Sequence, residues 1–145
     1  MAKNSQQQAL LTEQRIHQAI VDIFMEKGWE AITYGSIAKY TGLSRGGVQR
    51  IVPSKEAMTE AFQGQVYQYI LGQLDLSDAL KTAQTWETAF LQPKFKNCIK
   101  FLITSVNAPQ QGRAKTKQCL DALQGKLGKE TLFSLLGWSV YALIS

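Results

Sequence analysis

The sequence has few of the residues from which catalytic and metal sites are usually built. Its 145 residues include one histidine, His17, and two cysteines, Cys98 and Cys119. A His-centred catalytic triad or a two-histidine metal site would need partners that the sequence does not supply, and two cysteines cannot form a disulfide framework. We therefore expect no enzymatic activity, no metal and no cofactor. We expect both thiols to be buried apolar groups rather than redox sensors.

Long apolar runs are scarce as well. The longest uncharged apolar stretch, residues 132–145, is shorter than the roughly 20 residues with which a helix crosses a bilayer. The polar start of the sequence has neither the apolar core nor the small-residue cleavage site of a signal peptide. We therefore expect a soluble, cytoplasmic protein that has no membrane partner.

Proline is rare and the alternation typical of strands is lacking, and both absences favour helices. Only Pro53 of the three prolines lies in the first 90 residues. Ile16, Ile20, Ile23 and Phe24 instead recur at the spacing of one helical face. The sequence predicts an all-α chain whose first helix begins at residue 8 or 12 and ends at 27. The further helices are expected at residues 33–40, 45–52, 55–74, 76–91, 94–106, 111–127 and 129–144.

Positive charge is present, and it is concentrated in one window. The formal net charge is +5, and residues 31–55 contain Lys39, Arg45, Arg50 and Lys55 but no acidic residue. A basic window of this kind favours an anionic partner.

The same window has the pattern of two short helices joined by a tight turn. Thr33 can cap the first helix and Ser44 the second, and Gly42 lies in the turn between them. The residues expected to face inward and hold the helices together are Ile37, Ala38, Leu43, Val48 and Val52. Those left facing outward are Arg45, Gly46, Gln49 and Arg50. Because Arg can bond guanine and Gln can bond adenine in the major groove, the pattern predicts a helix-turn-helix element.

Residues 28–58 resemble the DNA-binding domain of TetR-family transcriptional regulators. The matches keep the family's spacing without a gap, at Thr33, Ile37-Ala38, Gly42, Ser44, Gly46 and Ser54-Lys55-Glu56-Ala57. With the flanking helices, the resemblance covers residues 12–60. It implies a TetR-like all-α fold, with a three-helix DNA-binding domain at residues 1–54. A reduced helical domain at residues 55–145 would serve for dimerisation and, by family habit, for ligand binding.

The resemblance also implies how the chain would contact DNA, as a homodimer on an inverted repeat. The residues placed at base edges or the adjacent backbone are Arg45, Gly46, Gly47 and Gln49. Those placed at phosphates are Thr33, Tyr34, Ser44, Arg50 and Lys55, and Arg50 could also reach a base. The sequence departs from the family at Gln49, where an aromatic residue is common, and at Gly35, where a polar or basic residue is common. The operator sequence therefore cannot be carried over.

Beyond residue 60 we find no motif of any family, and the apolar pattern is the main guide. The last helix is apolar on nearly all sides, which suggests burial on two sides. We expect it to form a dimer interface with the preceding helix. The residues expected there are Leu120, Leu123, Leu127, Phe133, Leu136, Trp138, Val140, Tyr141 and Ile144.

A small hydrophobic effector, the ligand that the family resemblance implies, would need a pocket in the second half. The candidate lining is Tyr67, Trp86, Phe90, Phe95, Cys98 and Phe101. The alternative is that these side chains form an ordinary core.

Three functions follow from these patterns. The leading one is a dimeric transcriptional repressor that binds double-stranded DNA and is released by a small molecule. The second is an effector-free DNA-binding or protein-interaction module, controlled by a partner protein or by concentration. A small helical enzyme is the weakest, because no Cys–His, Ser–His or paired-carboxylate constellation is present to carry chemistry.

Overall fold

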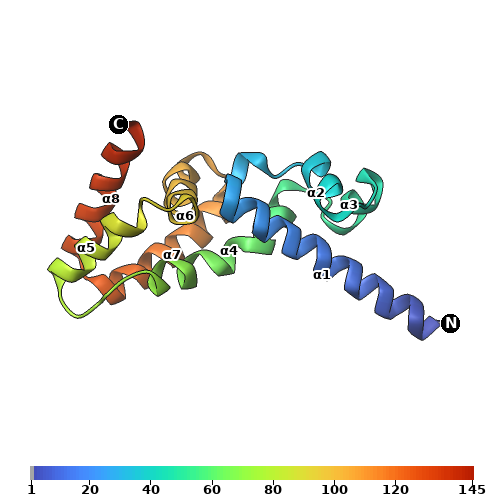
Figure 1. Cartoon of the computed structure of the whole chain (residues 1–145), viewed down its shortest axis with the longest axis horizontal. Coiled ribbons are helices and arrows are strands. Elements are labelled where there is room, and N and C mark those ends of the chain that lie inside the picture. The colour runs from blue at the N-terminus through green and yellow to red at the C-terminus, as the bar shows by residue number, and fades with distance from the viewer. Residues whose placement is uncertain (1) are drawn as a thin grey trace. The chain divides into compact units, whose positions relative to one another are not determined.

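The computed structural model describes residues 2–145, with side chains from Ser5 onward, and every regular element in this range is a helix. The predicted all-α class is therefore confirmed. The α-helices are α1 (Ala2–Lys27), α2 (Tyr34–Thr41), α3 (Arg45–Ile51), α4 (Lys55–Gly72), α5 (Ala79–Ala89), α6 (Pro93–Thr104), α7 (Gln110–Leu127) and α8 (Lys129–Ile144) (Figure 1). Two short 3-10 helices, η1 (Trp29–Ala31) and η2 (Ser105–Asn107), follow α1 and α6.

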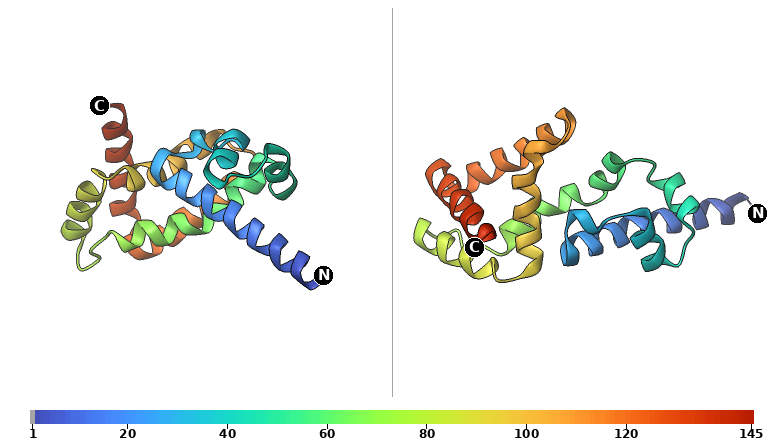
Figure 2. Two further views of the ribbon diagram at one scale, coloured as in Figure 1. Left: turned by 45° about the vertical axis from the view of Figure 1, so that its right-hand side comes forward. Right: turned by 90° about the horizontal axis from the view of Figure 1, so that it is seen from above.

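Several helix ends differ from the sequence-based bounds. Helix α1 begins at Ala2 rather than at residue 8 or 12, and its first turns reach past α2 and α3 (Figure 2). Helix α5 begins only at Ala79, because the Asp78 carboxylate caps it by accepting a hydrogen bond from Lys81 N at 2.8 Å. The apolar spacing used for the prediction locates a helical face, whereas the end of a helix depends on such single contacts.

The chain divides into two compact units, Met1–Gly64 and Gln65–Ser145. The division falls inside α4, later than the expected boundary after residue 54. The first part of α4 belongs to the N-terminal unit because its Phe62 ring stacks on Phe24 with centroids 4.0 Å apart. Both rings are fully buried.

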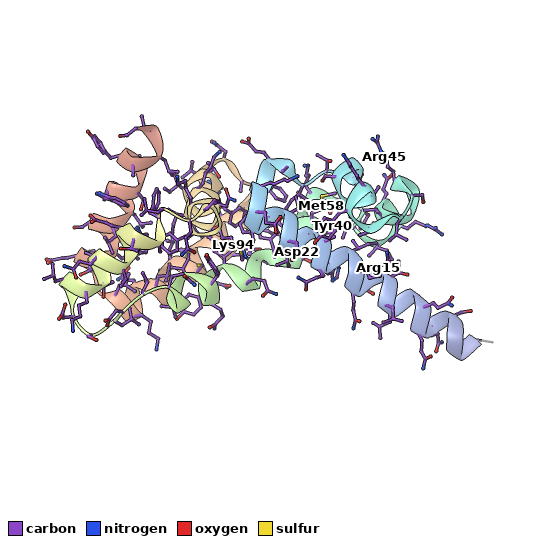
Figure 3. The ribbon with its side chains drawn as sticks, viewed as in Figure 1. Arg15, Asp22, Tyr40, Arg45, Met58 and Lys94 are labelled. Carbon is purple, nitrogen blue, oxygen red and sulfur yellow. The ribbon has the colours of Figure 1, made fainter. Side chains whose placement is uncertain are left out.

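The N-terminal unit is built on the apolar face of α1. Ile16, Ile20, Ile23 and Phe24 are all buried, as their spacing predicts. Polar contacts then fix α2 against α1: Arg15 Nη2 donates to Thr41 O at 2.5 Å, and Tyr40 Oη donates to Asp22 Oδ2 at 2.7 Å (Figure 3).

The C-terminal unit has a core that contains hydrogen-bonded hydroxyls. Helices α5 and α8 lie side by side (Figures 1 and 2), and the Trp86 indole N–H donates to Ser139 Oγ at 2.8 Å between them. Between η2 and α7, Thr116 Oγ1 donates to Ser105 Oγ at 2.9 Å. All four side chains are buried, and because their polar atoms are paired, their burial avoids the cost of an unsatisfied group.

Candidate nucleic-acid interface

The α2–α3 pair is shaped by caps that the sequence specifies. Thr33 and Ser36 form a reciprocal capping box at the start of α2, with both hydrogen bonds at 2.9 Å. Gly42 ends the helix in the left-handed region at φ 77°, where L side chains are strained. Ser44 then starts α3 by accepting from Gly47 N at 3.0 Å. These contacts fix the turn between the two helices.

The inner face of this pair is apolar and closed. Ile37 and Val48 are fully buried and Val52 is almost so. Leu43 and Ala38, also expected to face inward, are half-buried. The pair therefore presents one fixed outer face.

That outer face carries the residues predicted to meet DNA bases. Arg45, Gly46 and Gln49 are exposed, together with Arg50, and Gly47 is half-buried beside the Ser44 cap. Figure 3 shows Arg45 at the surface of the α2–α3 pair. An α-helix with exposed Arg and Gln has the donors and acceptors that read base edges in a major groove.

The residues predicted to meet phosphates fall into two groups. Thr33 and Ser44 are exposed, and each oxygen accepts a cap bond, which leaves the hydroxyl hydrogen for another acceptor. Tyr34 and Lys55 instead hold the unit together. The Tyr34 hydroxyl donates to Val52 O at 2.9 Å, and Lys55 Nζ donates to Ile32 O at 3.2 Å.

Lys55 has a second contact that the sequence did not indicate. Its ammonium nitrogen lies 5.2 Å from the centroid of the Trp29 ring, a cation–π distance. An ammonium has three N–H donors, so the bond to Ile32 O leaves two for an anion. Tyr34 has no second donor for an anion, because its single phenolic hydrogen is already donated to Val52 O.

Sequence reasoning missed the contacts that hold α1 against α2. Arg15, Asp22 and Tyr40 look like ordinary surface residues in the sequence, and nothing in their spacing signals that they meet. Asp22 also accepts from Gln18 Nε2 at 2.9 Å. The hydrogen bond that the Tyr40 hydroxyl donates to Asp22 is the largest of the effects that raise the pKa of Tyr40 above its ordinary value.

The aromatic residues expected to line a pocket pack against one another. The Trp86 and Phe95 rings meet edge to face at 5.2 Å, and Phe90 and Trp138 do so at 5.1 Å. Trp86, Phe90, Phe95, Cys98 and Phe101 are buried, whereas Tyr67 is half-buried. These contacts are those of a packed core, and pocket lining stays a prediction.

The two cysteines, both expected to be buried, differ in exposure: Cys98 is buried, whereas Cys119 is only half-buried. Burial raises the pKa of Cys98 to about 12, with a smaller effect of the nearby Cys119, and burial raises the pKa of Cys119 to about 11. Both thiols are therefore protonated at neutral pH, and a protonated thiol is a poor nucleophile.

The residues expected at a dimer interface divide by exposure. Phe133, Val140, Tyr141 and Ile144 are exposed on α8, with Tyr141 75% and Ile144 82% exposed. Leu123 is fully buried within the chain. The intermediate group, partly covered by the chain itself, is Leu120, Leu127, Leu136 and Trp138.

Among the side chains that the structure describes, His, Cys, Asp and Glu form no group of three or more that could hold a metal ion. None of the described helices combines the length and apolar character needed to cross a membrane.

Comparison with protein families gives a match in the second half, where sequence reasoning found no motif. Residues 63–143 match the family described as the tetracycline repressor LuxT C-terminal domain. A search of curated proteins gave no match. The matched segment covers more than half of the chain and joins the all-α fold described above, so this chain belongs to the TetR-like family of transcriptional regulators.

Proposed function

We propose that the chain is a sequence-specific DNA-binding regulator, a dimeric repressor that places α3 in the major groove of each half of an inverted repeat. The observation that carries the proposal is the exposed face of α3, where Arg45, Gln49 and Arg50 are held outward by the Ser44 cap and the buried Val48. A TetR-like regulatory domain in the same chain supports it. Such a domain also implies a protein that is not an enzyme.

In this proposal the residues have distinct tasks. Arg45, Gly46, Gly47 and Gln49 meet base edges or the adjacent backbone, and Arg50 meets a phosphate or a base. Thr33, Ser44 and Lys55 have donors left for phosphate oxygens. Tyr34 can donate to a phosphate only by giving up its bond to Val52 O, so we assign it first to the frame of the DNA-binding unit.

The exposed apolar face of α8 supports the homodimer. Phe133, Val140, Tyr141 and Ile144 recur at helical spacing on that face. A contiguous apolar face of this kind commonly marks a protein–protein contact. We propose that two copies of α8 pack through it, with Leu120 and Leu127 of α7 at its edge.

A second function, an effector-free module, is favoured by one observation. The side chains expected to line an effector pocket instead make edge-to-face contacts with one another. A protein of this kind would respond to a partner protein or to its own concentration. Release by a small hydrophobic molecule remains part of the leading proposal, and it requires that the molecule bind the DNA-incompetent state more tightly.

The deciding experiment is selection of random double-stranded DNA on the purified protein at about 0.15 M salt, a physiological ionic strength. We expect enrichment of an inverted repeat whose half-sites lie about one helical turn apart, or a multiple of it. Affinity for the enriched site should fall steeply and linearly on a log–log plot against salt. Binding that is salt-dependent but selects no sequence would overturn the proposal.

Replacing Arg45 by alanine should weaken binding to the selected site by about 1–3 kcal/mol and relax base preference at one position in each half-site. The loss of a bidentate guanidinium contact is the expected cause. Lys39→Ala is the matched control, because Lys39 is an exposed cation of the same window that we assign no contact. Repeating the selection with both variants measures the effect, and an unchanged base profile for Arg45→Ala would remove Arg45 from the base-reading set.

A further inference from the structure

Gly35 lies in the first turn of α2, beneath the side chain of Arg45. A Cβ atom at position 35 would lie 3.0 Å from Arg45 Nη2, 3.4 Å from Cζ and 3.7 Å from Nε. The guanidinium group would therefore have to move by a few tenths of an ångström to make room for a Cβ at position 35. Arg45 is the first residue of α3, so this contact joins the starts of the two helices.

The backbone gives no reason for a glycine at this position. The glycines with positive φ are Gly28, Gly42 and Gly128 among the described residues, so Gly35 has a conformation open to any residue. Within a helix, glycine is less stable than alanine by about 1 kcal/mol. Because glycine has no side chain, the Arg45 guanidinium can lie close to the backbone at position 35.

We propose that Gly35 is a specificity-determining position that acts through Arg45. Its bare Cα allows the guanidinium to rest against the first turn of α2, and this resting place sets where the Arg45 donors stand on the DNA-binding face. The inference rests on the proposed function and adds a positioning residue to it. Preorganised donors bind more tightly because less side-chain freedom is lost on binding.

The chain offers a variant that separates this effect from folding. In Gly35→Ala, the added Cβ approaches only the far end of a flexible side chain, so the guanidinium can move away without disturbing the backbone. Gly64→Ala is the matched control. It makes the same change inside α4, where a Cβ would meet no heavy atom within 4 Å. Both variants should be at least as stable as the original chain, because alanine is the better helix former.

The first test uses the full chain without DNA. The ¹⁵Nε–Hε NMR signal of Arg45 is assigned by its loss in Arg45→Ala. We expect this signal to shift in Gly35→Ala and to stay in place in Gly64→Ala, because only the first change removes the resting place. An Arg45 signal that is unchanged in Gly35→Ala would overturn the inference, whatever the protein binds.

The second test compares DNA selection by the original chain, Gly35→Ala, Arg45→Ala and the double variant. We expect Gly35→Ala to weaken binding to the selected site about twofold to threefold, the lower end of the cost of moving one side chain away from its preferred rotamer. Base preference should change at the same position that Arg45→Ala affects. In the Arg45→Ala background, Gly35→Ala should have no further effect.

The outcomes separate the inference from the proposed function. The role of Gly35 would be overturned if Gly35→Ala reduced affinity for the selected site equally in the original chain and in the Arg45→Ala background. It would also be overturned if Gly35→Ala left the base preference unchanged. In both cases the proposed DNA binding would stand. If the original chain selects no sequence, the proposed function fails, and the inference fails with it as a statement about specificity. The NMR comparison then still decides whether Gly35 positions Arg45.

Discussion

Replacing Phe62 by alanine is expected to lower the free energy of unfolding of the N-terminal unit by about 3–5 kcal/mol. Phe62 is fully buried, and its ring stacks on Phe24 with ring centroids 4.0 Å apart. The centroids of the Phe62 and Trp29 rings lie 5.6 Å apart. Its removal leaves a cavity between α1 and α4, and dense surroundings fill such a cavity only in part. Because this contact holds α4 in the N-terminal unit, DNA binding should weaken together with stability.

Urea unfolding followed by ¹⁹F NMR of fluorotryptophan-labelled protein can measure this effect. The chain has three tryptophans: Trp29 reports on the N-terminal unit, and Trp86 and Trp138 report on the C-terminal unit. In Phe62→Ala, the midpoint of the unfolding transition reported by Trp29 should move to a lower urea concentration. Leu91→Ala is the control, because Leu91 is 81% exposed and exposed positions usually change stability by less than about 0.5 kcal/mol. A Phe62→Ala protein with an unshifted Trp29 transition would mean that α4 is held elsewhere.

Replacing both Tyr141 and Ile144 by aspartate is expected to convert the proposed dimer into folded monomers. Tyr141 and Ile144 are the most exposed apolar side chains of α8. The free-energy cost of burying two unpaired carboxylates in an apolar interface would far exceed the free energy that the contact between the two α8 helices gains. A monomer contacts one half-site at a time, so affinity for the full inverted repeat should fall on the order of 100-fold or more, the usual gain from linking two binding sites.

Light scattering and DNA titration of the double variant test this prediction. Leu91→Asp serves as the control, because it adds a charge at an exposed apolar residue outside α8. Trp138 is a poorer choice for such a test, since its ring packs on Phe90 of the same chain and its loss would disturb the monomer. A double variant that remains dimeric and binds the full site normally would place the interface on another surface.

The N-terminal unit could be predicted in detail because its signals are local. Thr33, Gly42 and Ser44 specify the caps and the turn through contacts within four residues of sequence. The apolar stripe of α1 likewise follows from helical periodicity. Exposure of Arg45 and Gln49 then follows, because the inward positions are already taken by buried residues such as Val48.

What could not be predicted depends on contacts between distant residues. The bonds from Arg15 to Thr41 O, from Tyr34 to Val52 O and from Lys55 to Ile32 O join residues 18 to 26 positions apart. Each uses a backbone carbonyl, which carries no sequence signature. The role of Gly35 was hidden for the same reason, because its neighbour Arg45 is brought to it only by the turn between α2 and α3.

The second half was harder because its sequence does not show how its apolar residues pack. Its aromatic residues fit a core or a pocket equally well in the sequence, and only their edge-to-face contacts favour the core. Apolar residues on all sides of α8 indicated two buried faces. Which residues of α8 face inward depends on the packing of α5 and α7 against it. Leu123 of α7 is expected at the interface from the sequence, but it is fully buried within its own chain.

The hydrogen bond between Trp86 and Ser139 constrains how this protein can change during evolution. Ser139 accepts from the indole N–H and donates to Leu135 O at 2.7 Å, so a side chain that replaces it must do both. Alanine at 139 would leave a buried indole N–H unpaired, whereas phenylalanine at 86 would remove that need. The order of change is therefore constrained: position 139 must keep an acceptor for as long as tryptophan stands at position 86, whereas tryptophan can be lost first because Ser139 still donates to Leu135 O.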